Sequence, residues 1–114
     1  MSEILLISDQ LTYCIFREPV DMRMQFDGLS GVVLKRLQLH IADERTMFFF
    51  FNKRRTHLKA ILCEKSGMTM FYRRLHSSVF ELPPFEAGQK SINLDIILLT
   101  SLLQGLCLHT FKNK

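Results

Sequence analysis

The chain has 114 residues, 47% of them hydrophobic and 23% charged, and this composition favours one packed globular domain over a disordered segment. It has no uncharged apolar run as long as a membrane-spanning helix, and its first apolar stretch follows an acid rather than the cations of a signal peptide. We therefore expect a single domain over residues 1–114, located in the cytoplasm and without contact to a membrane.

The formal net charge of +4 is unevenly distributed along the chain. Residues 1–44 contain four cations and seven acids, whereas residues 45–80 contain eight cations and one acid, Glu64. Residues 81–114 contain three of each. The resulting local charge of +7 in the middle third favours binding to a polyanion or to an acidic protein surface.

The first elements predicted along the chain are a short strand and a long helix. Residues 10–16 are rich in aromatic and β-branched side chains, and Pro19 ends this strand. Asp21 is placed to cap a helix that continues through residue 38. One face of this helix should pack on a sheet, since large apolar residues recur every three or four positions: Met22, Phe26, Leu29, Val33 and Leu37.

Residues 47–59 join a phenylalanine-rich strand directly to a basic segment. The run Phe48 to Phe51 places phenylalanine on both faces of a strand over residues 47–52, so this strand should be central or covered on both sides. Residues 53–59 hold four cations, and we interpret them as a surface that the strand presents.

Residues 58–64 and 69–75 are predicted to form a hairpin. They flank Ser66-Gly67, in which glycine supplies the positive φ that a two-residue turn requires. In this register Lys59 faces Arg74 across the two strands. Directly opposed cations are unfavourable, so the sequence either exposes both to water or offers them to an anion.

Two further elements complete the predicted fold. Residues 79–85 are predicted as a short strand ended by two prolines, and residues 93–106 as a helix that starts at Asn93 with Asp95 in its first turn. Apolar residues surround most of this helix, which is therefore buried or exposes an apolar side for docking to another chain or for forming a homo-oligomer. We expect an α+β fold: a mainly antiparallel sheet of four to five strands, with a helix after the first strand and a C-terminal helix.

Five segments of the chain, in this order, resemble one protein family. They are PVDMRMQFDGL (19–29), FFFFNKRRTHLKAIL (48–62), GMTMFYRRL (67–75), FELPPF (80–85) and LLQGL (102–106). The family is the accessory protein, often called TnpB, of the bacterial insertion-sequence-sixty-six elements, and the resemblance covers residues 11–107. It implies a role in moving the element together with the transposase that is encoded beside it.

The basic residues around the predicted hairpin are the strongest candidates for a binding site: Lys53, Arg54, Arg55, Lys59, Arg73 and Arg74. Such side chains bind DNA phosphates through charged hydrogen bonds and the release of counterions, and His57 and Tyr72 can add stacking. No motif indicates base recognition, so we expect sequence-independent phosphate contacts. Two alternatives stay open: a solvated basic face without a ligand, and an adaptor surface that binds an acidic protein without DNA.

The segment DMRMQFD and the glycine after it form a second group, which the resemblance marks as a family motif: Asp21, Arg23, Phe26, Asp27 and Gly28. Arg23 and Asp27 are four residues apart on the predicted helix and can form an ion pair, so we interpret the motif as structural. Gly28 favours the close approach of a neighbouring group, or else a bend in the helix. Asp21 and Asp27 would point in different directions, which makes a metal-dependent nuclease site the less favoured alternative.

The histidines and cysteines do not indicate a metal or cofactor site. The four histidines and three cysteines lack the close spacing of metal ligands. Three widely spaced cysteines suit reduced thiols rather than disulfides, and Cys63, inside a predicted strand, should be a packed thiol rather than a nucleophile. We therefore expect no metal, no cofactor and no enzymatic activity.

Overall fold

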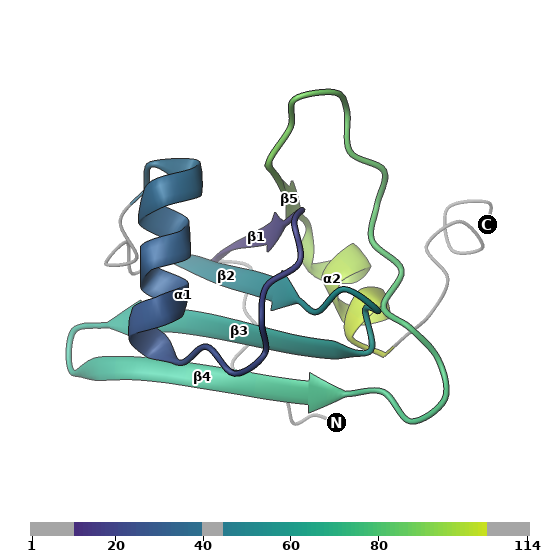
Figure 1. Cartoon of the computed structure of the whole chain (residues 1–114), viewed down its shortest axis with the longest axis horizontal. Coiled ribbons are helices and arrows are strands. Elements are labelled where there is room, and N and C mark those ends of the chain that lie inside the picture. The colour runs from purple at the N-terminus through teal and green to yellow at the C-terminus, as the bar shows by residue number, and fades with distance from the viewer. Residues whose placement is uncertain (1–10, 40–44, 105–114) are drawn as a thin grey trace.

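The computed structural model describes residues 11–39 and 45–104, which form a five-stranded sheet with a helix on each face (Figure 1). The elements in chain order are β1 (Thr12–Phe16), α1 (Phe26–Val32), its π-helical continuation η1 (Val33–Leu37), β2 (Thr46–Phe51), β3 (His57–Glu64), β4 (Gly67–Arg74), β5 (Ser91–Leu94) and α2 (Ile96–Leu103). This arrangement confirms the predicted α+β fold, with one helix after the first strand and another after the last.

The sheet is mixed, and its strand order is β4-β3-β2-β1-β5. β1 runs parallel to β2, whereas the other three strand pairs are antiparallel. A parallel neighbour can be reached only through a crossover, and α1 provides it by lying across one face of the sheet (Figure 1). The sheet is therefore mainly antiparallel, as predicted, with one parallel pair that the sequence did not predict.

The phenylalanine run forms β2 in the middle of the sheet, and its side chains are covered on both faces, as predicted. Phe48 and Phe50 join the core beneath α1, whereas Phe49 and Phe51 join the core beneath α2. None of the four is more than 2% exposed. On the α2 side the Phe51 ring also meets Phe80, with 5.5 Å between the ring centroids.

α1 begins at Phe26 rather than near Asp21, so the predicted cap is wrong. Gln25 precedes the helix in an extended conformation and makes no side-chain cap. Asp21 instead opens a turn, because its carbonyl accepts the Met24 N–H and its carboxylate accepts the Arg23 N–H. The predicted apolar face is confirmed, since all five of its residues lie in or against the core beneath α1: Met22, Phe26, Leu29, Val33 and Leu37.

Residues 79–85 do not form the predicted strand. Pro83 and Pro84 have no N–H group to donate to a strand ladder, and the segment instead runs irregularly from one edge of the sheet toward the other. It is still anchored, because the Phe80 N–H donates to the Arg55 carbonyl at 2.7 Å and the Phe80 side chain is buried.

The fifth strand is β5, and its second half lies where the sequence predicted the start of a helix. Asn93 is in this strand, so the predicted helix start at Asn93 is wrong. α2 begins after Asp95, whose carboxylate accepts the Leu98 N–H at 2.8 Å and caps the helix. The predicted helix end at residue 106 lies outside the described residues.

The hairpin of β3 and β4 forms, but its turn lies one residue earlier than predicted, at Lys65-Ser66. Lys59 consequently faces Tyr72 and Arg74 faces His57, so the predicted opposition of Lys59 and Arg74 is wrong. The change moves each pairing by two residues and leaves every side chain on its predicted face. It places an aromatic ring opposite each cation, which removes the repulsion between them.

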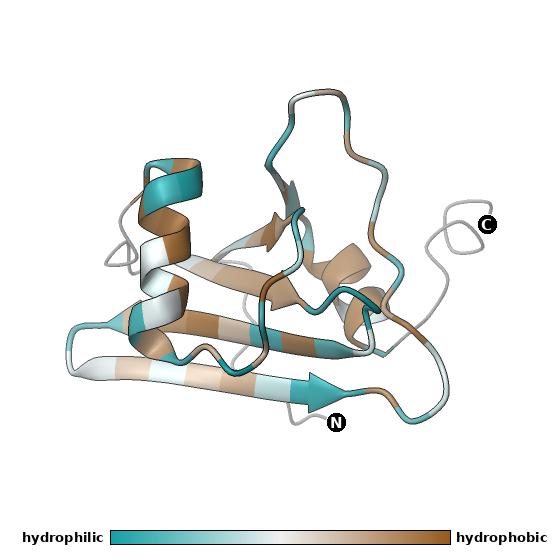
Figure 2. Cartoon of the chain, viewed as in Figure 1, coloured by the Kyte–Doolittle hydropathy of each residue, from teal (hydrophilic) through white to brown (hydrophobic). Residues whose placement is uncertain are grey.

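Hydropathy follows this layered arrangement. Figure 2 shows α2 and the inner strands as largely hydrophobic, with hydrophilic residues at the β2–β3 turn and at the end of β4. Within the described ranges, no helix is long and apolar enough to cross a membrane. The hydrophilic end of the hairpin is where the predicted basic surface must lie.

Candidate nucleic-acid interface

Asn52 braces the turn between β2 and β3. Its side-chain oxygen accepts the backbone N–H groups of Thr56 and His57 at 2.9 and 3.0 Å, and its amide nitrogen donates to the Thr56 hydroxyl at 3.0 Å. The Asn52 carbonyl also accepts the Arg55 N–H at 3.0 Å. The hydrogen bond between the Arg55 N–H and the Asn52 carbonyl closes a turn whose two central residues are Lys53 and Arg54, and the Asn52 side chain holds the backbone that follows it.

Three of the predicted cations are exposed at this end of the hairpin, and none has a partner among the described residues: Lys53, Arg54 and Arg74. We call them the presented cations. Lys53 and Arg54 occupy the turn, and Arg74 ends β4 opposite His57. Lys53 and Arg54 also line a surface pocket of about 370 Å³ together with Asp21, His57 and Tyr72.

Arg55 serves the turn mainly through its backbone. Its φ of 60° lies in the left-handed region, which residues other than glycine seldom adopt. In this conformation its carbonyl accepts the Phe80 N–H, so the turn is joined to the segment that follows β4. Because its side chain is half-buried, Arg55 is less accessible to a ligand than the presented cations.

Lys59 is buried, so the prediction that it belongs to the exposed basic surface is wrong. The residue is only 4% exposed, and its Nζ donates to the Met24 carbonyl at 2.6 Å. The same ammonium lies 5.2 Å from the centroid of the Tyr72 ring. A buried cation needs such partners because its desolvation is costly. Lys59 therefore ties β3 to the turn that precedes α1.

Arg73 is also held inside the fold, on the opposite face of the hairpin. Its Nε donates to the Leu103 carbonyl at 2.6 Å, and its side chain is half-buried. A cation at this position satisfies an otherwise unpaired carbonyl at the end of α2 and opposes the negative end of the helix dipole. Since neighbouring residues of a strand point to opposite faces, Arg74 is directed away from α2.

The family motif forms a structural turn and the first part of α1. Arg23 pairs with Asp21 rather than with Asp27, since Nη2 and Nε of Arg23 lie 2.7 and 3.1 Å from Asp21 Oδ2. The Arg23 guanidinium and N–H lower the pKa of Asp21 from 3.8 to about 2. Asp27 is exposed in the first turn of α1, where its carboxylate interacts favourably with the positive end of the helix dipole. A side chain at Gly28 would crowd Met24, whose Cβ would lie 3.3 Å away.

The described residues offer no cluster of three or more histidine, cysteine, aspartate or glutamate side chains that could hold a metal ion. Cys14 is buried in β1, and this burial raises the pKa of its thiol. Cys63 is half-buried within β3. Among the described residues, neither thiol interacts with the presented cations.

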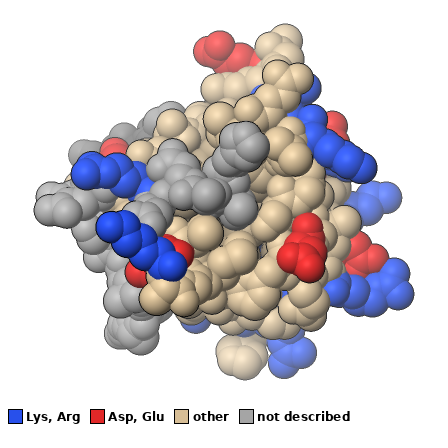
Figure 3. All heavy atoms as spheres, turned by 90° about the vertical axis from the view of Figure 1, so that its left-hand side faces the viewer, with Lys and Arg blue, Asp and Glu red and all other residues tan. Residues whose placement is uncertain are grey.

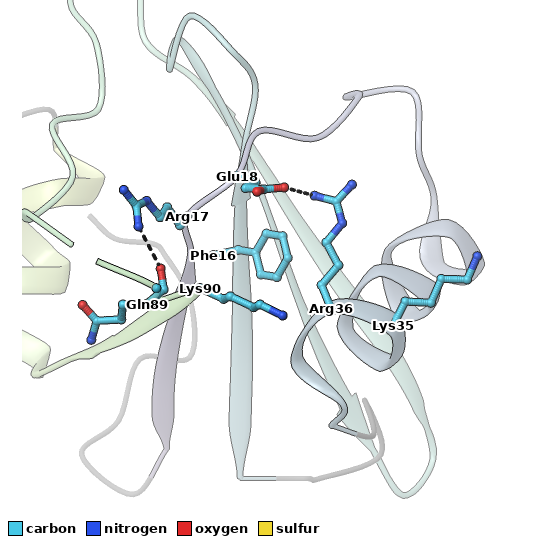
Figure 4. A pocket seen from close by; sticks show the side chains of 8 residues that line it. Phe16, Arg17, Glu18, Lys35, Arg36, Gln89 and Lys90 are labelled. Carbon is cyan, nitrogen blue, oxygen red and sulfur yellow. Dashed lines mark hydrogen bonds and ion pairs between the residues drawn. The ribbon is translucent and has the colours of Figure 1, made fainter. Parts of the chain in front are cut away.

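A second cationic pocket, of about 400 Å³, was not predicted from the sequence (Figure 4). Its cations come from three separate parts of the chain: Arg17, Lys35, Arg36 and Lys90. The first three belong to residues 1–44, and the net negative charge of this part of the chain gave no indication of a cationic pocket. Only the α1 crossover and the pairing of β1 with β5 bring them to one place.

The cations are not spread evenly over the surface. In the side view of Figure 3, lysine and arginine side chains stand mainly toward the margins of the molecule, and the middle of the visible described surface is largely uncharged. The net charge is therefore divided among local groups of cations rather than forming one continuous basic face on this side.

Comparison with known proteins supports one family. The model of the family described as IS66 Orf2 like protein matches residues 11–113, which is most of the chain. Neither the curated proteins nor the solved structures gave a match. The motif turn, the braced β2–β3 turn and the hairpin all lie within the matched range, and the chain belongs to the IS66 Orf2-like family of insertion-sequence accessory proteins.

Proposed function

We propose that the protein is a non-enzymatic accessory protein of transposition that contacts DNA through Lys53, Arg54 and Arg74 and acts with the transposase of the same element. One observation carries this proposal: the presented cations are exposed and have no partner among the described residues. The neighbouring cations Lys59 and Arg73 are already engaged by backbone carbonyls. The fold thus leaves a defined subset of its positive charge available.

The chemistry of this surface suits phosphate groups. Exposed lysine and arginine side chains release condensed counterions when they neutralise phosphates, and this release favours binding without regard to base sequence. The braced turn holds Lys53 and Arg54 on a backbone that loses little freedom on binding. Tyr72, which is 55% exposed beside them, offers a ring face to a base or sugar.

The test is fluorescence-anisotropy binding to duplex DNA over a salt series. For the Lys53→Ala/Arg54→Ala/Arg74→Ala variant, we expect the log–log salt slope to fall by roughly 2.7, at about 0.9 for each lost phosphate contact. A single Arg54→Ala variant is compared with Lys65→Ala, which removes an equal charge from the exposed β3–β4 turn. Equal losses in these two variants would indicate a diffuse charge effect and contradict a site at the β2–β3 turn.

An adaptor function is the second candidate, because Tyr72 and Met22 lie beside the cations in the same pocket and aromatic side chains with arginine are typical of protein interfaces. Purified transposase would then bind the protein after nuclease treatment. The triple variant should lose this binding, while the wild type should fail to bind DNA even at low salt.

Nuclease activity is the enzymatic alternative. Both carboxylate oxygens of Asp21 accept hydrogen bonds from Arg23, which leaves Asp21 poorly placed as a metal ligand. We expect no DNA cleavage with magnesium or manganese. Metal-dependent cleavage that disappears in a folded Asp27→Asn variant would contradict the non-enzymatic role.

Only a narrow part of α2 is open to the self-association that we propose for this helix. Leu99, Leu102 and Leu103 are buried against the sheet, whereas Ile97 is 59% exposed. Ile97→Glu is therefore the variant that tests this contact without entering the core. A sedimentation experiment over a concentration series should show an oligomer that this variant loses, and a wild type that stays monomeric would contradict the contact.

A further inference from the structure

The second cationic pocket lies between the end of the α1–η1 helix and the strands β1 and β5. Phe16, the last residue of β1, lies between the two walls in Figure 4. Lys35 and Arg36 come from η1 on one side, and Lys90 comes from the residue before β5 on the other. The Lys90 side chain extends toward the helix side of the pocket, where Arg36 is located.

The pocket contains both engaged and unengaged cations. Arg17 is engaged, because its Nη1 donates to the carbonyls of Glu86 and Gln89 at 3.3 and 3.2 Å. Arg36 forms an ion pair with Glu18. Lys35 and Lys90 have no partner among the described residues, and both are exposed. With four cations and one carboxylate, the lining has a net charge of +3.

The wall that carries Lys90 is fixed before any ligand binds. The loop turns at Gly88, whose φ of 79° suits glycine, and the Gln89 N–H closes the turn on the Glu86 carbonyl at 3.0 Å. The Lys90 carbonyl accepts the Arg17 N–H at 3.0 Å. Arg17 therefore positions the loop from β1, and only the lysine side chains need to be ordered by a ligand.

We propose that this pocket binds a phosphoryl group, and that the phosphate of a DNA backbone is its source. The choice of DNA rests on the proposed function, whereas the phosphate chemistry rests on the pocket alone. The unengaged Lys90 side chain extends toward Arg36 on the helix wall, so a compact, multiply charged anion between them would meet cations from both walls, with Lys35 adding a further unengaged charge at the rim. The volume of about 400 Å³ is within the range of small-ligand sites.

The position of the pocket supports a shared role with the presented cations. The segment that follows β1 borders this pocket through Arg17 and Glu18 and borders the pocket of the β2–β3 turn through Val20 and Asp21. Two residues of extended chain span about 7 Å at most, so the two pockets lie side by side along this segment. One DNA strand passing over the segment would meet cations from both pockets.

Glu18 gives the proposal a gain-of-function test. Its carboxylate holds Arg36 and repels an anion in the same pocket. Glu18→Gln removes the negative charge and releases the guanidinium, so phosphate should bind up to about fivefold more tightly. Lys35→Ala and Lys90→Ala should each weaken binding about two- to fivefold. Lys65→Ala, which removes the same charge from a remote turn, should leave the affinity unchanged.

The first measurement is an NMR titration of the full chain with inorganic phosphate at constant ionic strength, with chloride as the matched control. We expect phosphate to shift the amide signals of residues 88–90 and Arg36 in the wild type, more strongly in Glu18→Gln and weakly in the two lysine variants. No phosphate-specific shift in either the wild type or Glu18→Gln would overturn the proposal.

DNA binding separates the two sources of phosphate. If the backbone is the ligand, Lys35→Ala and Lys90→Ala should each reduce the salt slope by roughly 0.9, while Lys65→Ala should not. If inorganic phosphate binds but both slopes are unchanged, the phosphoryl site stands and DNA is overturned as its source. If the triple variant of the β2–β3 turn has no effect but the lysine variants do, the proposed function fails at that turn and the pocket remains.

Discussion

The basic segment contains two kinds of cation that the sequence does not distinguish. Lys59 and Arg73 lie on opposite faces of the hairpin, where Lys59 donates to the Met24 carbonyl just before α1 and Arg73 donates to the Leu103 carbonyl at the end of α2. Lys53 and Arg54 lie on a braced turn and face solvent. The difference shows that the fold can divide a cluster of positive charge in a sequence between side chains that hold the structure together and side chains that remain exposed at the surface.

Among the variants that test this difference between the cations, Lys59→Ala should have the largest effect on stability. The change leaves the Met24 carbonyl without its donor and removes the buried stem of the side chain, so we expect a loss of about 2–4 kcal/mol in the free energy of unfolding. Urea denaturation followed by circular dichroism measures it. Lys53→Ala should change this free energy by no more than about 0.5 kcal/mol, and equal losses in the two variants would abolish the distinction.

Arg73 and Arg74 provide the same comparison between adjacent residues. Arg73→Ala removes a charged hydrogen bond to the Leu103 carbonyl and should lower stability by about 1.5–3 kcal/mol. Arg74→Ala should be nearly neutral for stability and should weaken DNA binding instead. Thermal unfolding measures the stability of both variants, and fluorescence anisotropy measures their binding to DNA. An Arg73→Ala protein as stable as the wild type would contradict the structural role of Arg73.

Asn52→Ala tests whether the presented cations depend on the brace beneath them. The substitution removes the acceptor for two backbone N–H groups and should lower stability by about 1 kcal/mol. DNA binding should weaken although no cation is lost, because the turn must then be ordered on binding. Unchanged binding in a folded variant would mean that the shape of the turn does not matter.

The smallest effect is expected from the ion pair of Asp21 and Arg23, which is largely exposed. Arg23 lowers the pKa of Asp21 from 3.8 to about 2, so the pair stabilises the folded state above pH 3.8 and loses this effect as the pH falls toward 2. The melting temperature of the wild type should exceed that of Asp21→Asn slightly near pH 5. The difference should shrink as the pH is lowered to 2, and a difference that grew would contradict the assignment.

Local sequence patterns predicted the parts of the fold that depend on local spacing. The phenylalanine run identified the central strand, and the apolar repeat identified the face of α1. The spacing of Gly67 from the flanking strands predicted a hairpin but placed its turn one residue late. Residues 79–85 had the composition of a strand, yet the prolines and the pairing of β5 with β1 decided against it.

The candidate sites were predictable only in part, because the charge of a residue does not reveal whether the fold exposes or buries its side chain. The turn residues Lys53 and Arg54 were identified correctly as exposed. The burial of Lys59 depends on the position of the Met24 carbonyl, which is 35 residues away in the sequence. The pocket of Lys35 and Lys90 depends on two long-range strand pairings and has no local signal.

The pairing of β1 with β5 also has a consequence for the order in which the chain folds during synthesis. The turn of the β3–β4 hairpin needs only two residues, whereas Phe16 of β1 pairs with Ser91 of β5 across most of the chain. The ribosome therefore releases the hairpin well before β1 can acquire its second neighbour. A gene copy interrupted ahead of codon 91 would encode a sheet that ends at the open edge of a largely buried strand, and such a product should aggregate rather than retain partial activity.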